Sequence, residues 1–166
     1  MNALALYKLR DARPEDAAAI IEVQHSAIQG VSGIYPQAVL DAWDPSPVSP
    51  EVLERRAARI ASGERIAIVA GSESGEIAGY GSIKPAESEL YAVYVSAGHG
   101  RRGIGRLILS RLEELASLAG LTELWLDASI NAEPFYRANG YISEAPGEHV
   151  LPSGARIPCV RMRKRL

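Results

Sequence analysis

A strand, a loop of glycines and arginines, and a helix follow one another without a break near the middle of the chain. Residues 93–95 are largely apolar, residues 98–106 read Gly-His-Gly-Arg-Arg-Gly-Ile-Gly-Arg, and an amphipathic pattern continues over 107–119. A helix that begins in such a loop points unpaired backbone N–H groups and the positive end of its dipole into one small volume. The neighbouring arginine side chains add charge there. The sequence therefore predicts a site for a phosphate or pyrophosphate group, and hence for a phosphorylated small molecule or cofactor.

The composition is typical of one globular domain, and we expect a single domain over residues 1–166. Hydrophobic residues make up 47% of the chain and charged residues 23%. The net charge of −2 argues against a general nucleic-acid binder, which usually carries a marked basic excess. No apolar run approaches the roughly 18 residues that span a bilayer. We therefore expect neither nucleic acid nor membrane as a partner.

Cysteine and histidine usage limits the chemistry further. Cys159 is the only cysteine, which rules out an intrachain disulfide and a metal site built on several cysteines. No pair among His25, His99 and His149 has the helical spacing of metal ligands, so we predict no metal. The first residues lack the pattern of a signal peptide. These features together predict a cytoplasmic protein in a reducing compartment.

The hydrophobic periodicity predicts alternating groups of strands and helices. The predicted strands lie at residues 4–9, 66–70, 77–83, 89–95, 121–128, 141–145 and 157–163, and the predicted helices at 13–29, 35–43, 49–62, 107–119 and 133–139. Most neighbouring strands are joined by short turns, so a mixed, mostly antiparallel sheet of about seven strands is expected, with helices on both faces. The crossover over residues 89–128 predicts one parallel pair in the middle of this α/β (α+β) fold.

The glycine-rich loop alone is open to several interpretations. Gly98, Gly100 and Gly103 match the GxGxxG pattern of dinucleotide-binding folds, and Asp127 follows the next strand where a ribose ligand can lie. That fold, however, needs more parallel βαβ units than this chain provides. The glycines can also serve only to form a turn and to allow close packing of helix on strand.

The region over residues 90–141 resembles the GCN5-related N-acetyltransferase (GNAT) superfamily. The apolar strand 90–95 followed by Gly103-Ile104-Gly105 is similar to the family's strand and Gln/Arg-x-x-Gly-x-Gly/Ala motif. Residues 129–141, which contain Phe135-Tyr136 and then Gly140-Tyr141, are similar to its Asn-x-x-Ala-x-x-Phe-Tyr segment. The resemblance implies a GNAT-like sheet with splayed central strands, and acetyl-CoA as the cosubstrate of an N-acetyltransferase.

The resemblance also implies a set of cofactor-binding residues. The pyrophosphate of acetyl-CoA would lie at the helix N-terminus, and its pantetheine arm would lie beside the preceding strand and pair with it like an added strand. Gly100 replaces the usual Gln or Arg, which implies weaker side-chain anchoring rather than loss of the site. Ala97 replaces a common proline, which implies a looser loop. Ser129 replaces a frequent Asn, and its hydroxyl can still hydrogen bond to pantetheine. The implied residues are Val93, Tyr94, Val95, Gly100, Arg101, Arg102, Gly103, Ile104, Gly105, Arg106, Ser129 and Asn131.

The family pattern implies two catalytic candidates. Tyr136 occupies the position of a phenol that protonates the leaving thiolate, and Glu89 lies where a general base stands in the histone-acetylating branch. The alternatives are a tyrosine packed in the core and a solvated carboxylate, with a chain of water molecules as the base. Tyr35, Tyr80 and His149 are candidates for the acceptor pocket, whereas we assign Trp43 to the core.

The acceptor is expected to be a primary amine of a small molecule or a protein, whose nitrogen attacks the thioester directly. Homodimers are common in the family, so a homodimer is one expectation for the assembly. Two other functions stay open at this point: a non-catalytic module that binds or senses acyl-CoA, and a nicotinamide-dependent enzyme.

Overall fold

The computed structural model describes residues 6–31, 33–44, 46–151 and 153–166. Within them, one seven-stranded sheet has the order β1-β2-β3-β4-β5-β7-β6. The strands are β1 (Tyr7–Asp11), β2 (Ile66–Ser72), β3 (Ile77–Lys84), β4 (Glu89–Val95), β5 (Glu123–Ser129), β6 (Ile142–Val150) and β7 (Arg156–Arg165). The helices are α1 (Ala17–Gln29), α2 (Gln37–Trp43), α3 (Pro50–Ala61), α4 (Ile104–Leu118) and α5 (Glu133–Ala138), with short 3-10 turns η2 (Pro14–Asp16), η3 (Pro85–Glu87) and η4 (Ala97–His99).

The predicted order of elements and the mixed, mostly antiparallel sheet are confirmed, while several boundaries differ. The first strand continues to Asp11 rather than ending at residue 9, and residues 4 and 5 of its predicted span lie outside the described residues. Strand β6 continues through Pro146 to Val150, well past the predicted end at 145. Because β6 is an edge strand, a proline that donates no ladder hydrogen bond is tolerated there.

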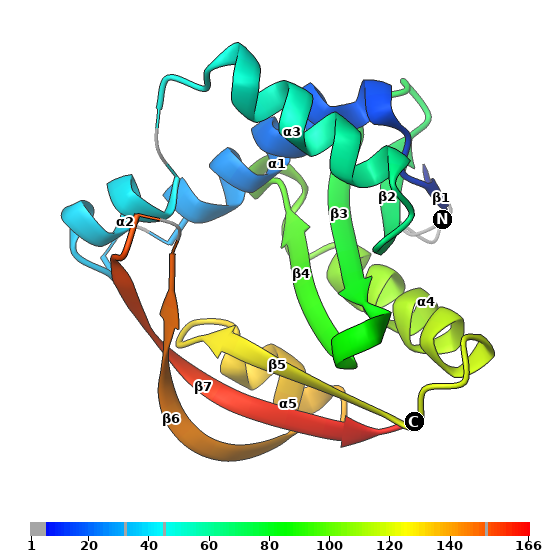
Figure 1. The fold of residues 1–166 in the computed structure, drawn as a ribbon, viewed down its shortest axis with the longest axis vertical. Helices are drawn as coiled ribbons and strands as arrows, with labels where there is room; N and C mark the ends of the chain where they lie inside the picture. Colours follow the sequence, from blue (N-terminus) through cyan, green and yellow to red (C-terminus); the bar gives the residue numbers. More distant parts are fainter. Residues whose placement is uncertain (1–5, 32, 45, 152) are drawn as a thin grey trace.

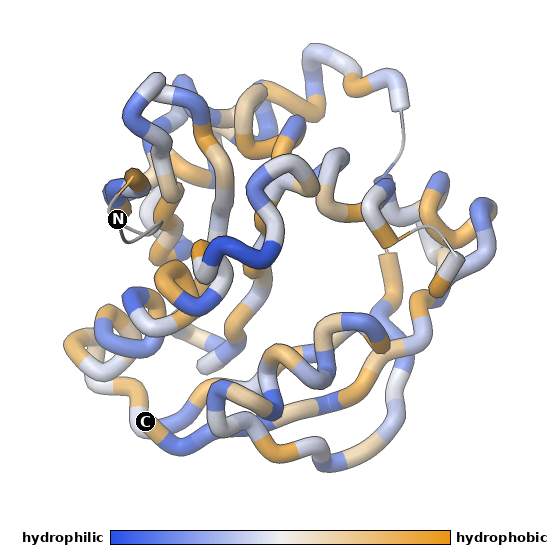
Figure 2. The backbone as a smooth tube through the Cα atoms, turned by 180° about the vertical axis from the view of Figure 1, so that it is seen from behind, coloured by the Kyte–Doolittle hydropathy of each residue, from blue (hydrophilic) through white to orange (hydrophobic). Residues whose placement is uncertain are grey.

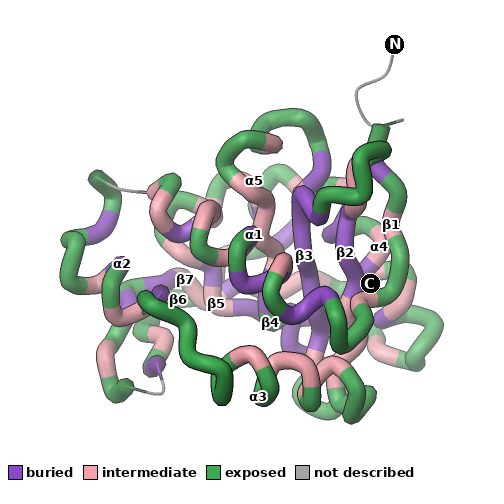
Figure 3. Tube along the Cα trace, turned by 90° about the horizontal axis from the view of Figure 1, so that it is seen from above, coloured by how far each residue is buried: buried purple, intermediate pink, exposed green. Residues whose placement is uncertain are grey.

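Strand β3 lies between β2 and β4 and is buried along almost its whole length (Figure 3). Its two faces carry different side chains. Tyr80 packs with Ile20 and Val23 of α1 in one hydrophobic cluster, while Gly79 and Gly81 lie against α4 on the opposite face. Residues along α4 alternate between hydrophobic and hydrophilic (Figure 2), and Ile108 is among those buried against the sheet.

Strands β4 and β5 form the one parallel pair, and they separate almost at once. Their register holds a single pair of residues, Glu89 and Trp125. From there β4 and β5 diverge, as Figure 1 shows. An irregularity in the β3–β4 register leaves Tyr91 as an extra residue in β4, and such a bulge bends a strand and increases its twist. The expected splaying of the central strands is thus present, and each strand keeps its outer neighbour.

None of the helices in the described part of the chain is long and apolar enough to cross a membrane.

The close approach of α4 to β3 gives a stability test. A Cβ atom at Gly81 would lie 2.5 Å from Cγ2 of Ile108 and 2.7 Å from Cδ1 of Leu112. We therefore expect Gly81→Ala to destabilise the fold by about 1–3 kcal/mol through overpacking, as measured by urea unfolding. A Cβ at Gly98 would meet nothing within 4 Å, so Gly98→Ala should stay within about 0.5 kcal/mol of the parent. A Gly81→Ala variant as stable as the parent would contradict this packing.

Candidate active site

The loop between β4 and α4 leaves a run of backbone N–H groups free. Gly100 N–H donates to the Ala97 carbonyl at 3.3 Å, and Leu107 N–H donates to the Gly103 carbonyl at 3.0 Å. Between these two, the N–H groups of residues 101–106 reach no acceptor among the described residues. Arg101 and Gly103 adopt positive φ angles of 61° and 84°, which turn the backbone into the first turn of α4. The loop and the first turn of α4 therefore present a run of unpaired backbone donors, the arrangement from which the sequence predicts an anion site.

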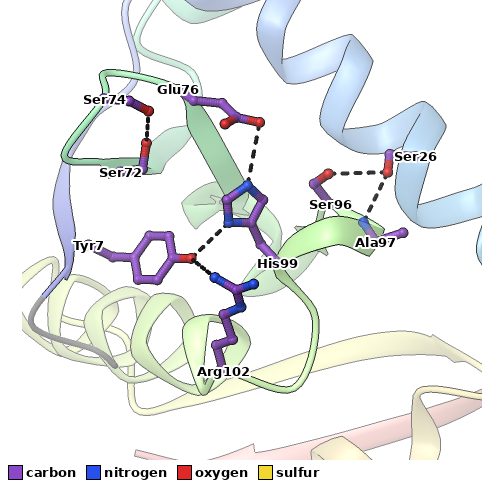
Figure 4. A network of polar contacts seen from close by, with 9 residues as sticks. All are labelled: Tyr7, Ser26, Ser72, Ser74, Glu76, Ser96, Ala97, His99 and Arg102. Carbon is purple, nitrogen blue, oxygen red and sulfur yellow. Dashed lines mark hydrogen bonds and ion pairs between the residues drawn. The ribbon is translucent and has the colours of Figure 1, made fainter. Parts of the chain in front are cut away.

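Polar contacts from distant segments hold the start of this loop (Figure 4). The Ala97 N–H donates to Ser26 Oγ at 2.9 Å, which ties the loop to α1. The His99 ring lies between Tyr7, whose hydroxyl is 2.7 Å from Nδ1, and Glu76, whose Oε1 is 3.4 Å from Nε2. Arg102 donates from Nη1 to the same Tyr7 hydroxyl at 3.3 Å. These contacts tie residues 97–102, and with them the start of the run of free amides, to α1, to β1 and to the residue before β3.

In the described part of the chain, no strand pairs with the β5-facing edge of β4 beyond Glu89. The Ser96 N–H donates to the Ala78 carbonyl of β3 at 2.9 Å. Because successive residues of a strand direct their backbone groups to opposite edges, the N–H and C=O groups of Val93 and Val95 face the gap instead. Strand β5 is paired along its length with β7 on its far side. The gap therefore offers an extended segment a free strand edge to pair with.

A cavity of about 440 Å³ occupies this gap and continues toward α4 and α5. Most of the expected cofactor residues line it: Val93, Tyr94, Val95, Arg101, Gly105, Ser129 and Asn131. A neighbouring hollow of about 430 Å³ is lined by Gly103, Ile104 and Arg106, together with Phe135 of α5. The Ile104 side chain is buried in the core, so only its backbone is available to a ligand. Gly100 and Arg102 line neither cavity, since Arg102 turns to Tyr7.

Tyr136 stands in the wall of the 440 Å³ cavity, 7% exposed. Its ring packs edge-on against Phe135 and Tyr141, with ring centroids 5.0 Å and 5.6 Å away. Burial raises its pKa above the ordinary tyrosine value, and the nearby Tyr94 adds to the shift. Burial likewise raises the pKa of Tyr94, which lines the same cavity, to about 12. Both phenols are therefore protonated at neutral pH, and Tyr136 is the one at the position that the sequence predicts for the proton donor.

A second cavity, of about 370 Å³, lies on the other side of the gap, between α3, β4 and the β6–β7 hairpin. It contains two of the expected residues, Glu89 and His149. The two cavities adjoin each other, because six residues line both. The shared residues are Trp43, Tyr91, Ala92, Tyr94, Asp127 and Ser129.

Both carboxylates in the second cavity are paired with cations. Glu89 is 6% exposed and its Oε2 lies 2.7 Å from Nζ of Lys84. Asp127 accepts from Arg161 Nε at 2.6 Å and from Nη2 at 3.3 Å. The contact with Lys84 holds the Glu89 carboxylate in one place in the cavity wall. Asp127, which the dinucleotide interpretation would give to a ribose, is committed to Arg161 in a sheet with a single parallel pair.

Cys159 also lines the second cavity. Burial raises the pKa of its thiol to about 11, and the charge of Asp127 contributes. The thiol is therefore protonated at neutral pH, which makes it a poor nucleophile. The described residues hold no group of three or more His, Cys, Asp or Glu side chains that can bind a metal ion.

Two of the expected acceptor residues lie elsewhere. Tyr35 is buried, and its hydroxyl donates to the Pro158 carbonyl and accepts from the Ile130 N–H. Tyr80 is buried against α1. Neither lines the cavities described above. Each ring instead packs in a hydrophobic cluster, Tyr35 with Leu40 and Ile157, and Tyr80 with Ile20 and Val23.

Sequence reasoning also missed residues that do line the site. Trp43, assigned to the core, packs edge-on against Tyr35 but also lines both cavities. Arg55, Arg56 and Arg59 of α3 line the second cavity. Their spacing places them on neighbouring turns of one helix, so the sequence indicates a cluster of arginines. It does not indicate which surface of the protein α3 covers.

Comparisons with known proteins agree with this geometry. A family model described as an acetyltransferase (GNAT) domain matches residues 23–166. A comparison with curated proteins gives no match. The chain is similar, at 26% identity and a TM-score of 0.84, to a solved GCN5-related N-acetyltransferase, class-II aminotransferase, from Rhodopseudomonas palustris, covering 96% of this chain and 95% of that one.

Two more distant structures share the fold. The PaiA N-acetyltransferase of Thermoplasma acidophilum, solved with coenzyme A, is 21% identical with a TM-score of 0.76 and coverage of 96% and 99%. The YncA structure from Salmonella typhimurium, solved with acetyl-CoA, is 24% identical with a TM-score of 0.68 and coverage of 96% and 94%. Because the family model spans most of the chain and the fold agrees, the chain belongs to the GNAT acetyltransferase family.

Proposed function

We propose that this chain is an acetyl-CoA-dependent N-acetyltransferase that moves the acetyl group to a primary amine by direct attack. One observation carries the proposal: the protonated, unengaged phenol of Tyr136 lines the same cavity as the free β4 edge and Arg101 of the amide-rich loop. The solved neighbours that contain coenzyme A or acetyl-CoA support the choice of cosubstrate. Acetyl-CoA would supply the activated acyl carbon and a thiolate leaving group.

The free N–H groups of residues 101–106 suit the diphosphate of the cosubstrate, because several amides and a helix dipole act on one anion. The backbone of Val93 and Val95 would pair with the amides of the pantetheine arm, as an added strand does. The Val95 N–H would then polarise the thioester carbonyl and stabilise the negative charge that develops on its oxygen.

The proton transfers fall to two side chains. Glu89 would take a proton from the acceptor, directly or through one water molecule, so that the nitrogen attacks as a free amine. As the C–N bond forms and the C–S bond breaks, Tyr136 would donate its phenolic proton to the departing thiolate. The proton that the nitrogen loses on becoming an amide would return to the Tyr136 phenolate through water. The raised pKa of Cys159 argues against a route through an acyl-cysteine.

Tyr136→Phe should lower kcat at least about 10-fold and leave the Kd of coenzyme A nearly unchanged, because it removes a proton donor and no packing. Thiol release and calorimetry measure the two quantities. Tyr141→Phe is the matched control, since its buried hydroxyl is next to Tyr136 but lines neither cavity. In the parent, kcat should not fall up to about pH 10, where an ordinary phenol ionises. Equal kcat in Tyr136→Phe and the parent would remove Tyr136 from the mechanism.

Glu89→Gln should lower kcat/KM about 10-fold or more at neutral pH, and the loss should shrink as the pH approaches the pKa of the acceptor amine, which then needs no base. A purely structural role would not produce this pH dependence. Glu87→Gln is the control: its carboxylate also contacts Lys84, at 3.5 Å, but is exposed and lines neither cavity. A loss that is the same at every pH would point away from Glu89 as the base.

Arg101 and Arg102 give a paired test of the binding loop. Arg101 lines both hollows beside the free amides, whereas the Arg102 guanidinium is hydrogen bonded to Tyr7. Arg101→Gln should weaken coenzyme A binding about 10-fold in calorimetry, as expected for a lost charge-assisted contact. Arg102→Gln should change it by less than about threefold. The reverse order would mean that the loop presents a different arginine to the ligand.

A further inference from the structure

Helix α3 places a group of arginines in the wall of the 370 Å³ cavity, where the proposed function puts the acceptor. Arg55, Arg56 and Arg59 all line it. Arg56 has a structural partner as well: its Nη2 donates to Gln24 Oε1 at 2.8 Å, and its guanidinium lies 6.0 Å from the centre of the Tyr80 ring. Arg55 and Arg59 are four residues apart and therefore neighbours on one face of the helix.

Among the described residues, none of these arginines forms an ion pair with a carboxylate. The acids of the same helix are Glu51, one turn before Arg55, and Glu54; both are exposed and neither lines the cavity. The salt bridges found across the described residues leave Arg55, Arg56 and Arg59 without an acidic partner within 4.0 Å. The same cavity does contain acids, Glu89 and Asp127, but each is already paired. Their partners, Lys84 and Arg161, do not line the cavity. The cavity therefore carries an excess of positive charge on its α3 side.

The lining of the cavity has two parts. Tyr94, Asp127 and Ser129 also line the cosubstrate cavity, and the base candidate Glu89 belongs to the same strand as Tyr94. The arginines of α3 line this cavity and not the cosubstrate cavity. An amine bound for transfer has to lie beside the shared residues, so the rest of the molecule is left to contact the unshared ones, the arginines among them.

We propose that the acceptor is a small amine that also bears an anionic group, a carboxylate or a phosphonate, and that Arg55 and Arg59 bind this group. The inference rests on the proposed function, because acetyl transfer determines where in the cavity the amine lies. A planar guanidinium matches a carboxylate or phosphonate with two parallel hydrogen bonds. The cavity volume of about 370 Å³ suits a molecule of amino-acid size. Polyamines and other polycationic acceptors are disfavoured, since they would meet like charge at α3.

Calorimetry of the protein, with and without coenzyme A, tests the inference. The probes are the protein amino acids, their carboxamides, 2-aminoethylphosphonate, and putrescine as the cationic comparison. We expect the best-bound acid to bind about 10- to 100-fold more tightly than its carboxamide, the range for hydrogen bonds to charged groups. The phosphonate arm tells which anionic group is preferred. Equal affinity of acid and carboxamide, or no affinity for any anionic amine, would overturn the inference.

The variant Arg55→Gln/Arg59→Gln should abolish that preference while the affinity for coenzyme A stays the same. Arg111→Gln removes one cation from the exposed surface of α4, away from the cavity, and is the control. Thiol release measured on the same panel separates the two proposals. Selective binding of anionic amines without thiol release would refute the acetyltransferase and keep the inference. Thiol release with neutral amines alone would support the acetyltransferase and refute the inference.

Discussion

The separation of β4 from β5 after one residue pair is the constraint on which the site depends. A sheet normally satisfies each strand on both edges, but beyond Glu89 the inner edge of β4 has no strand partner. The bulge at Tyr91 bends β4 away, and the full pairing of β5 with β7 holds the second half of the sheet apart. The result is one opening, with free backbone groups at its sides, into which both cavities lead.

The end of that opening is fixed by packing and by polar contacts together. The glycines of β3 let α4 lie directly on the sheet, which sets where its N-terminus falls. Ser26, Tyr7 and Glu76, from three different segments, then hold residues 97–102 in place (Figure 4). A loop held in this way needs little reordering when an anion arrives, so more of the interaction energy is available for binding.

Much of the fold was predictable from the sequence, because the local signals there are strong. Alternation in β2 and β3, glycine at the turns, and the helical pattern after Gly103 specify the elements, and the short connections specify their antiparallel order. The end of β6 was not predictable, because Pro146 and Gly147 look like a turn unless the strand is known to be an edge. The backbone cradle was predictable because it depends on the helix start itself, whatever side chains surround it.

The acceptor side was much harder to predict. Tyr35 and Tyr80 are of a residue type that often lines pockets, yet tertiary packing buries both side chains. From the sequence alone, Arg55 and Arg59 have the pattern of a solvent-exposed helix face. Only the structure shows that this part of α3 lines the cavity. Arg102 differs from Arg101 only in direction, which follows from the positive φ of Arg101 and the position of Tyr7. The positions of such side chains depend on contacts between distant segments, and local sequence periodicity carries no information on those contacts.

Amide hydrogen exchange, followed residue by residue as coenzyme A is added, tests the central claim most directly. Exchange at residues 101–106, and at Val93 and Val95 on the open edge of β4, should slow on binding, because those N–H groups gain acceptors they lack in the free protein. The N–H groups of Ser96 and Ala97, already bonded to Ala78 and Ser26, should change little by comparison. Protection that appears elsewhere while residues 101–106 exchange as before would contradict the claim.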